Sequence, residues 1–490
     1  MTTNVTTIAE GVTLTPAPAI ERQPAALPMI FFTEMWERFS YYGMRALLVI
    51  YLVNAVGMER ADALQIYATY TGLVYLTPIL GGYLADRFLG KRKAVLIGGL
   101  TMALGHFAMA FPALLHLALG LLIIGNGFFK PNMSTLLGSL YREHDPRRDG
   151  GFTIYYMGVN LGAFIAPLVA GTLGEKIGWH WGFGCAGIGM CLGLAQFIYG
   201  QAKLGDAGLP SGKTRLDRRD YIEILVYSVA AIPLVYVVMA AWSVLGPWWA
   251  LVPTAVKISL PVALLVALLV YIKGSCPKEE FHGSIAIIVL GMFVVFFWMG
   301  FEQAGGTMSL FADKQTDRMM FGWELPASYF QSINPLAIFA LGLPFAALWT
   351  WLETTRFASS TPTKMALGMI ILGLGFIVLA IADAQTAGGI KVGPQWLFIV
   401  FILHTMGELC LSPIGLSMVT KLAPARLVAL MMGVWYTANA VANYLAGVLE
   451  EMLAGTSFPL YWFLVGSSVG AGILLLLLTP LIKKLMHDRA

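Results

Sequence analysis

Charged side chains are scarce in this sequence. Asp, Glu, Lys and Arg together make up 12% of its 490 residues, whereas hydrophobic residues make up 58% and the mean hydropathy is +0.74. Soluble domains usually carry about 25% charged residues. The scarcity of charge therefore argues against a chain of ordinary soluble domains, although the length alone would allow about three of them.

Several other features are missing, and each absence excludes a class of protein. The four cysteines show no paired spacing, so no disulfide framework is indicated. The first 26 residues lack the basic start and apolar middle of a secretory signal peptide, and we expect a disordered cytoplasmic tail there. The sequence has no HExxH motif, no cluster of His and Asp, and no GxSxG at the end of an apolar run. These absences argue against an intramembrane enzyme and predict no metal or other cofactor. A repeated filter loop, which a channel would need, is also lacking.

Long apolar runs are what the sequence has instead. A helix needs roughly 20 mostly apolar residues to cross the bilayer, and the runs do not alternate as the strands of a membrane β-barrel would. The predicted fold class is therefore an all-α polytopic membrane protein with fourteen transmembrane helices. They lie near residues 27–54, 62–86, 94–113, 115–141, 151–175, 180–202, 220–243, 249–273, 283–311, 327–352, 362–383, 394–421, 427–452 and 458–482.

The distribution of Lys and Arg predicts the orientation, because cytoplasmic loops are enriched in these residues. With the N-terminus in the cytoplasm, the inner segments carry 22 of the 31 Lys and Arg residues and the outer segments six. This asymmetry predicts a multi-pass protein of the inner membrane with both termini in the cytoplasm. The net charge of +4 is thus explained by topology and does not indicate a nucleic-acid partner.

Polar breaks divide the spans into groups of six, two and six. Two six-helix halves are expected of a transporter that holds its substrate between repeated bundles near the membrane midplane. The predicted units are a tail (1–26), an N-terminal bundle (27–202), linkers with two extra helices (203–282), a C-terminal bundle (283–485) and a short cytoplasmic tail (486–490).

Seven ionisable residues lie well inside predicted spans. Each costs about 2.5–3.5 kcal/mol at a helix centre on insertion scales, so they must face a wet cavity or one another. A functional site is the default interpretation, and ion pairs that only hold helices together are the alternative. The seven residues are Glu34, Glu37, Arg38, Arg45, Lys130, Glu302 and Glu408.

Four of these charges fall in the first span together with two tyrosines. Their spacing from the first member is three, four, seven, eight and eleven residues, which places all six on one face of a helix. Two of them, Glu34 and Arg38, are four residues apart and can pair along that face. The stripe consists of Glu34, Glu37, Arg38, Tyr41, Tyr42 and Arg45.

The remaining intramembrane charges lie beside helix-breaking residues. Lys130 precedes Pro131, and proline inside a helix bends its axis. Glu302 and Glu408 lie in glycine-containing stretches, and interrupted helices mark binding sites in transporters. The alternative for Lys130 is that its long side chain extends along the helix and places the ammonium group at the membrane surface. Asn160 and Asn334 are polar residues inside predicted spans and are further candidates for the binding site. The alternative for each is a hydrogen bond that only joins two helices.

Two sets of motifs resemble known families. The stretch from Gly81 to Arg92 resembles the loop between the second and third spans of the major facilitator superfamily, and an ordinary basic inner loop is the alternative interpretation. Five further stretches carry the second resemblance: Glu34–Gly43, GFFKPN at 127–132, Phe152–Gly162, FEQ at 301–303 and GELCLSP at 407–413. They resemble motifs of the proton-dependent oligopeptide transporter (POT) family within that superfamily, and the resemblance covers residues 27–485. Two extra central helices fit its bacterial members.

The resemblance implies a major facilitator fold and a role for each candidate residue. Asp86 and Arg87 would lock the cytoplasmic ends of helices. Arg45 and Lys130 would bind a peptide carboxylate, and Glu408 would bind the peptide ammonium. The other implied substrate contacts are Asn160 and Asn334 to the peptide backbone, with Tyr41, Tyr42, Tyr75 and Trp435 lining the pocket. Proton coupling would fall to Glu34, Glu37, Arg38 and Glu302. The resemblance also implies that Arg45 is the partner of Glu302.

The implied function is import of di- and tripeptides by alternating access, coupled to protons, in a protein that works as a monomer. Proton-coupled transport of another small anion or zwitterion, such as nitrate, is the alternative within the family. Nitrate needs positive charge but no acidic partner. Glu408 together with Arg45 and Lys130 would make a pocket of both signs, which suits a zwitterion.

Overall fold

A computed structural model describes residues 22–142, 145–210, 215–355 and 359–487. The disorder predicted for residues 1–26 thus falls mostly outside the described residues. Long helices make up most of the described chain, because in the bilayer core a backbone must satisfy its own hydrogen bonds. The helices are α1 (Leu27–Asn54), α2 (Arg60–Leu84), α3 (Lys91–Ala108), α4 (Leu115–Gly138), α5 (Arg148–Thr172), α6 (Trp179–Gly200), α7 (Arg218–Leu251), α8 (Thr254–Ser275), α9 (Lys278–Phe301), α10 (Thr307–Lys314), α11 (Ile333–Glu353), α12 (Thr361–Gln385), α13 (Gln395–Leu422), α14 (Val428–Leu453) and α15 (Leu460–Met486).

A long helical segment lies at each of the fourteen predicted spans. Among the described residues, nine segments are long and apolar enough to cross a membrane by composition alone. Helix α1 is not one of them because it contains the charged stripe, whose burial must be explained by contacts inside the protein.

Two predicted spans are interrupted rather than continuous. The span predicted at 283–311 consists of α9, a short 3-10 turn (Glu302–Gly305) and α10, and the span predicted at 327–352 begins with a 3-10 turn (Ala327–Ser332) before α11. The first break is fixed by a close approach: a Cβ atom added at Gly305 would lie 2.0 Å from the hydroxyl of Tyr67. Glycine is therefore required where the chain passes α2.

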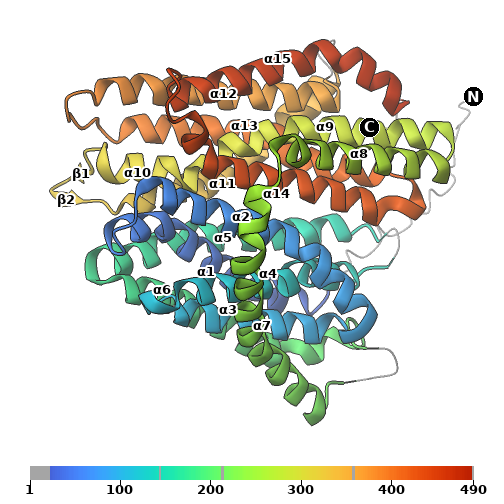
Figure 1. Ribbon diagram of the computed structural model, residues 1–490. Coiled ribbons are helices and arrows are strands. Elements are labelled where there is room, and N and C mark those ends of the chain that lie inside the picture. Colours follow the sequence, from blue (N-terminus) through green and yellow to red (C-terminus); the bar gives the residue numbers. More distant parts are fainter. Residues whose placement is uncertain (1–21, 143–144, 211–214, 356–358, 488–490) are drawn as a thin grey trace, which may run out of the picture.

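The helices form two bundles, α1–α6 and α9–α15, which lie one above the other in Figure 1. Each bundle has its own hydrophobic core. A short antiparallel hairpin of β1 (Met319–Met320) and β2 (Trp323–Glu324) marks one end of the molecule, which we call the hairpin end. Helix α1 begins and α15 ends at the opposite side, which we call the termini end.

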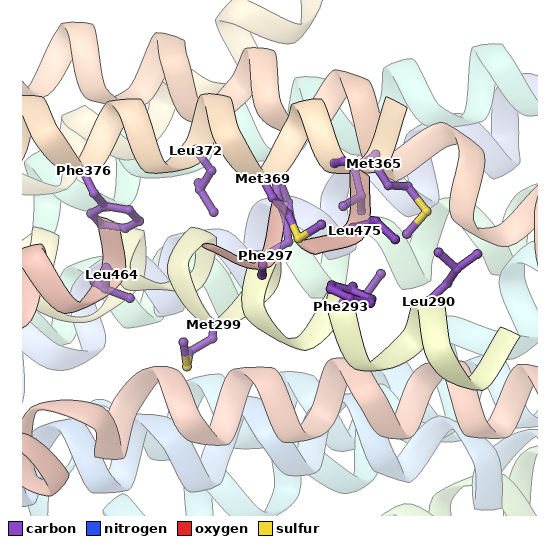
Figure 2. Packing of buried hydrophobic residues seen from close by; sticks show 14 of the residues in the cluster. Leu290, Phe293, Phe297, Met299, Met365, Met369, Leu372, Phe376, Leu464 and Leu475 are labelled. Carbon is purple, nitrogen blue, oxygen red and sulfur yellow. The ribbon is translucent and has the colours of Figure 1, made fainter. Parts of the chain in front are cut away.

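The core of the second bundle is built where α9, α12 and α15 meet. Figure 2 shows Phe293 and Phe297 of α9 facing Met369 of α12, and these side chains are at most 7% exposed. Apolar packing of this kind inside each bundle leaves the surfaces between the bundles free to carry polar residues.

The two extra helices attach to different bundles. Helix α7 crosses its neighbours steeply in Figure 1 and is tied to α3 by Lys93, whose Nζ lies 3.0 Å from Asp220 and 2.6 Å from Glu223. Helix α8 contacts α9, and its Ile272 is fully buried in the core of the second bundle. Most α7 and α8 side chains are exposed and apolar, as expected of helices that face lipid.

Candidate functional site

The stripe predicted on α1 is buried at the centre of the protein. Glu34, Glu37, Arg38, Tyr41 and Arg45 are each at most 6% exposed, and Tyr42 is partly buried. The one-face arrangement expected from the spacing is present, because these side chains contact one another and neighbouring helices. They form two separate groups along the helix.

The first group is centred on Arg38, which contacts two carboxylates. Its Nε lies 3.4 Å from Glu34, the pair predicted from their spacing. It also binds both oxygens of the adjacent Glu37, with Nη2 donating over 2.6 Å to Oε1. The side-chain amide of Asn126 on α4 donates to the same Glu37 oxygen over 3.4 Å. A buried guanidinium is thus shared by two acids and joined to a second helix.

The second group joins the two bundles. Arg45 Nη2 donates to Glu302 Oε2 over 2.5 Å, and Arg45 Nε donates to the hydroxyl of Tyr67 over 2.8 Å. Glu302 lies directly after α9 ends, so the helix break positions its carboxylate at the interface. The contact between Arg45 and Glu302 that the resemblance implied is therefore present.

Lys130 lies near this group on α4, above an aromatic ring. Its Nζ is 4.6 Å from the centre of the Tyr75 ring, within the range of a cation–π contact. The side chain remains partly exposed. It is within electrostatic reach of Glu34, Glu37 and Glu302. Lys130 is thus directed toward the charged centre rather than toward the membrane surface.

Glu408 on α13 supplies negative charge from the second bundle. The side-chain amide of Asn334 on α11 donates to Glu408 Oε2 over 2.8 Å and to the hydroxyl of Thr405 over 3.0 Å. Glu408 also lies within electrostatic reach of Arg45 and Glu302. Asn334 therefore orients the carboxylate while it joins α11 to α13.

Other predicted site residues make local contacts. The side-chain amide of Asn160 on α5 donates to the carbonyl of Tyr156 one turn earlier, over 2.9 Å. Trp435 on α14 is 4% exposed, and a Cβ added at Gly415 would lie 2.5 Å from its ring. These residues are buried or nearly so, and none of their hydrogen bonds joins the two bundles.

Asp86 and Arg87 lie apart from this site. They belong to a single π-helical turn (Ala85–Leu89) that follows α2 at the termini end, and both are exposed. The guanidinium of Arg87 lies 5.7 Å from the ring of Phe88. Their predicted role in locking helix ends stays a prediction.

Three residues of the site were not predicted. Tyr67 binds Arg45, Asn126 binds Glu37, and Thr405 binds Asn334. Each is a polar side chain in an apolar helix, and that was the available signal. Asn126 stands between two glycines and directly precedes the GFFKPN motif, but the resemblance implies no role for it.

Two helix bundles with buried charges of both signs at their interface define a membrane transporter of the major facilitator fold. Comparison with known proteins agrees. The family model described as PTR2, POT family, matches residues 92–462, and this chain belongs to the POT family.

Named relatives match along nearly their full length. The chain is 36% identical to "Peptide transporter YePEPT" of Yersinia enterocolitica, over 95% of this chain and 96% of that protein. It is 32% identical to "Di-/tripeptide transporter" of Lactococcus lactis subsp. cremoris, over 95% and 97%. A crystal structure of a peptide transporter POT in complex with sulfate superposes with a TM-score of 0.80 at 38% identity, covering 95% and 96% of the two chains.

Proposed function

We propose that this protein imports di- and tripeptides together with protons across the inner membrane, with both termini in the cytoplasm. The observation that carries the proposal is the division of charge at the interface. Cationic Arg45 and Lys130 belong to the first bundle, whereas Glu408 belongs to the second. A zwitterionic peptide would bind both bundles at once. The names of the relatives, which include a di-/tripeptide transporter, support the same substrate class.

Each end of the peptide would meet a group suited to it. Arg45 can bind a carboxylate through two parallel hydrogen bonds, and Lys130 adds a point charge. Glu408, held by Asn334, would accept hydrogen bonds from the peptide ammonium. We assign Asn160 and Asn334 to the peptide backbone and Tyr41, Tyr42, Tyr75 and Trp435 to the walls of the pocket, as the family resemblance implies.

Proton coupling would act through Arg45. In the structure this arginine is occupied by Glu302 and Tyr67, so a peptide carboxylate must compete with Glu302. A proton on Glu302 would remove that competition. The seven intramembrane charges are three positive and four negative, and one bound proton makes their sum zero. Neutrality favours closure around the substrate because excess buried charge is costly. Glu34, Glu37 and Arg38 would belong to the same proton pathway.

The test uses purified protein in vesicles, where accumulation and exchange of a labelled dipeptide are measured separately. Glu302→Gln imitates the protonated form. It should abolish accumulation driven by a proton gradient but keep exchange without a gradient. Glu408→Gln is the comparison variant. It should weaken binding of the free dipeptide. Binding of an N-acetylated dipeptide, which lacks the ammonium, should remain largely unchanged. A Glu302→Gln protein that still concentrates peptide under a gradient would move the coupling role to Glu34 or Glu37.

A further inference from the structure

An apolar crevice of about 300 Å³ lies between α7 and the first bundle. Its walls come from the turn after α2, from α3 and α4, and from one side of α7. The polar side chains among its lining residues are Thr101 and Tyr227. Because α7 is the extra helix, the crevice is a separate feature from the charged site at the bundle interface.

The crevice extends from the termini end along α3. Phe88 at its mouth belongs to the turn that follows α2, whereas Thr101 lies ten residues into α3. A rise of 1.5 Å per residue makes this depth about 15 Å, which is half of a hydrocarbon core of about 30 Å. The length of the crevice therefore matches the thickness of a single leaflet.

Its surroundings are those of a lipid-facing surface. On α7, Val226 and Val237 are 55% and 63% exposed, and such side chains on a transmembrane helix face acyl chains. The mouth is basic: exposed Arg87 is adjacent to Phe88, and Lys91 lies two residues beyond Leu89, another lining residue. Asp86 is the acidic neighbour. Basic pockets between transmembrane helices on the cytoplasmic side suit anionic lipid headgroups.

We propose that this crevice binds one acyl chain of an anionic glycerophospholipid, whose phosphate contacts Arg87 and Lys91. The depth and apolar walls of the crevice match the acyl chain of such a lipid, and its cationic mouth matches the anionic headgroup. The bound chain fills the space between α7 and the first bundle and adds an apolar contact to the ion pairs of Lys93. The inference does not depend on the transported substrate.

The experiment uses vesicles that contain either photoactivatable phosphatidylglycerol or photoactivatable phosphatidylcholine, with the label in the acyl chain. Cross-linked peptides are identified by mass spectrometry. Ala230 on α7 is exposed and lines the crevice, so Ala230→Trp should fill it from the edge. Ala240→Trp is the matched control, because Ala240 is an exposed alanine of the same helix outside the crevice lining.

We expect phosphatidylglycerol to label the peptides that contain Thr101 and Leu234, and Ala230→Trp to lose this labelling while Ala240→Trp keeps it. Combined Arg87→Gln and Lys91→Gln should remove the preference for the anionic lipid without removing chain labelling. The thermal stability of each variant verifies that it is folded. Equal labelling in Ala230→Trp and the parent would overturn the acyl-chain site. Equal labelling by both lipids in the parent would overturn the anionic headgroup.

Discussion

The two ends of the interface between the bundles differ sharply. Helix α2 passes along both, so it allows a direct comparison. In its half nearer the hairpin end, a Cβ added at Gly447 of α14 would lie 2.4 Å from Ala68, and one added at Gly72 would lie 3.4 Å from the Cβ of Tyr444. In its other half, Leu80 and Tyr83 are 61% and 56% exposed.

Polar contacts follow the same division. Hydrogen bonds of Asn54, Arg60 and Glu175 join the bundles near the hairpin end, and the contact of Arg45 with Glu302 joins them at the charged site. Glu175 beyond α5 accepts the backbone N–H groups of Ala327 and Ser328 over 2.7 and 2.9 Å. The structure is therefore a state closed at the hairpin end, and transport requires these contacts to break.

The largest effect is expected from a covalent lock at the closed end. Cβ atoms 3.4 Å apart are close to disulfide spacing. In a background without native cysteines, oxidised Gly72→Cys/Tyr444→Cys should lose peptide uptake and regain it on reduction. The control is Gly291→Cys/Ala438→Cys, a pair 3.8 Å apart within the second bundle, which should transport in both states. Uptake that survives oxidation of the first pair would mean that transport does not require the hairpin end to open.

A single carboxylate at the closed end should have the next largest effect. Glu175→Gln turns an acceptor of two N–H groups into a side chain with one acceptor and one donor, so a backbone N–H loses its partner. Hydrogen bonds to charged groups contribute about 1.5–3 kcal/mol, so the open population should rise roughly ten- to hundredfold. The readout is the labelling rate of Leu64→Cys, 1% exposed in the parent, with a maleimide added at the hairpin end.

Glu59→Gln is the matched control for this measurement. Glu59 is an exposed acid at the same end, immediately before α2. It should leave the labelling rate of Leu64→Cys unchanged, and an equal increase from both variants would mean that general charge, not the contact of Glu175, keeps this end closed.

The sequence predicted the local parts of this site better than the parts made by distant segments. The face of α1 follows from helical spacing alone, because residues four apart on one helix must be neighbours. The partner of Arg45 lies 257 residues away, and only the family resemblance indicated it. Tyr67 could not be assigned because its role depends on how closely the 3-10 turn after α9 passes α2 at Gly305. Closure at the hairpin end could not be predicted either. Glu175 binds backbone N–H groups, and because nearly every residue has one, the sequence does not identify them as partners.

The open half of α2 should be accessible to water. The helix face that packs on α14 through Ala68 and Gly72 continues through Ile79, which is 42% exposed. We expect Ile79→Cys to react about tenfold faster than Ala68→Cys with a polar maleimide added at the termini end, since buried sites react only after local opening. Similar slow rates at both positions would place Ile79 against lipid instead of an aqueous opening.

The smallest effect is expected from the exposed ion pair of the β-hairpin. Lys176 Nζ lies 3.1 Å from Glu324, whose side chain is 47% exposed. The hydrogen bond from Lys176, followed by the charge of Arg318, lowers the pKa of Glu324 below its usual value. A carboxylate with a lowered pKa stabilises the closed state above its ordinary pKa, near 4.3, and loses that contribution as pH falls through the lowered value.

Exposed ion pairs contribute about 0.2–1 kcal/mol. Glu324→Gln should therefore raise the labelling rate of Leu64→Cys less than about fivefold, equally at pH 6 and pH 8, and high salt should abolish the difference. A change as large as that of Glu175→Gln would mean that the hairpin, not the buried carboxylate, is the principal closure of this end.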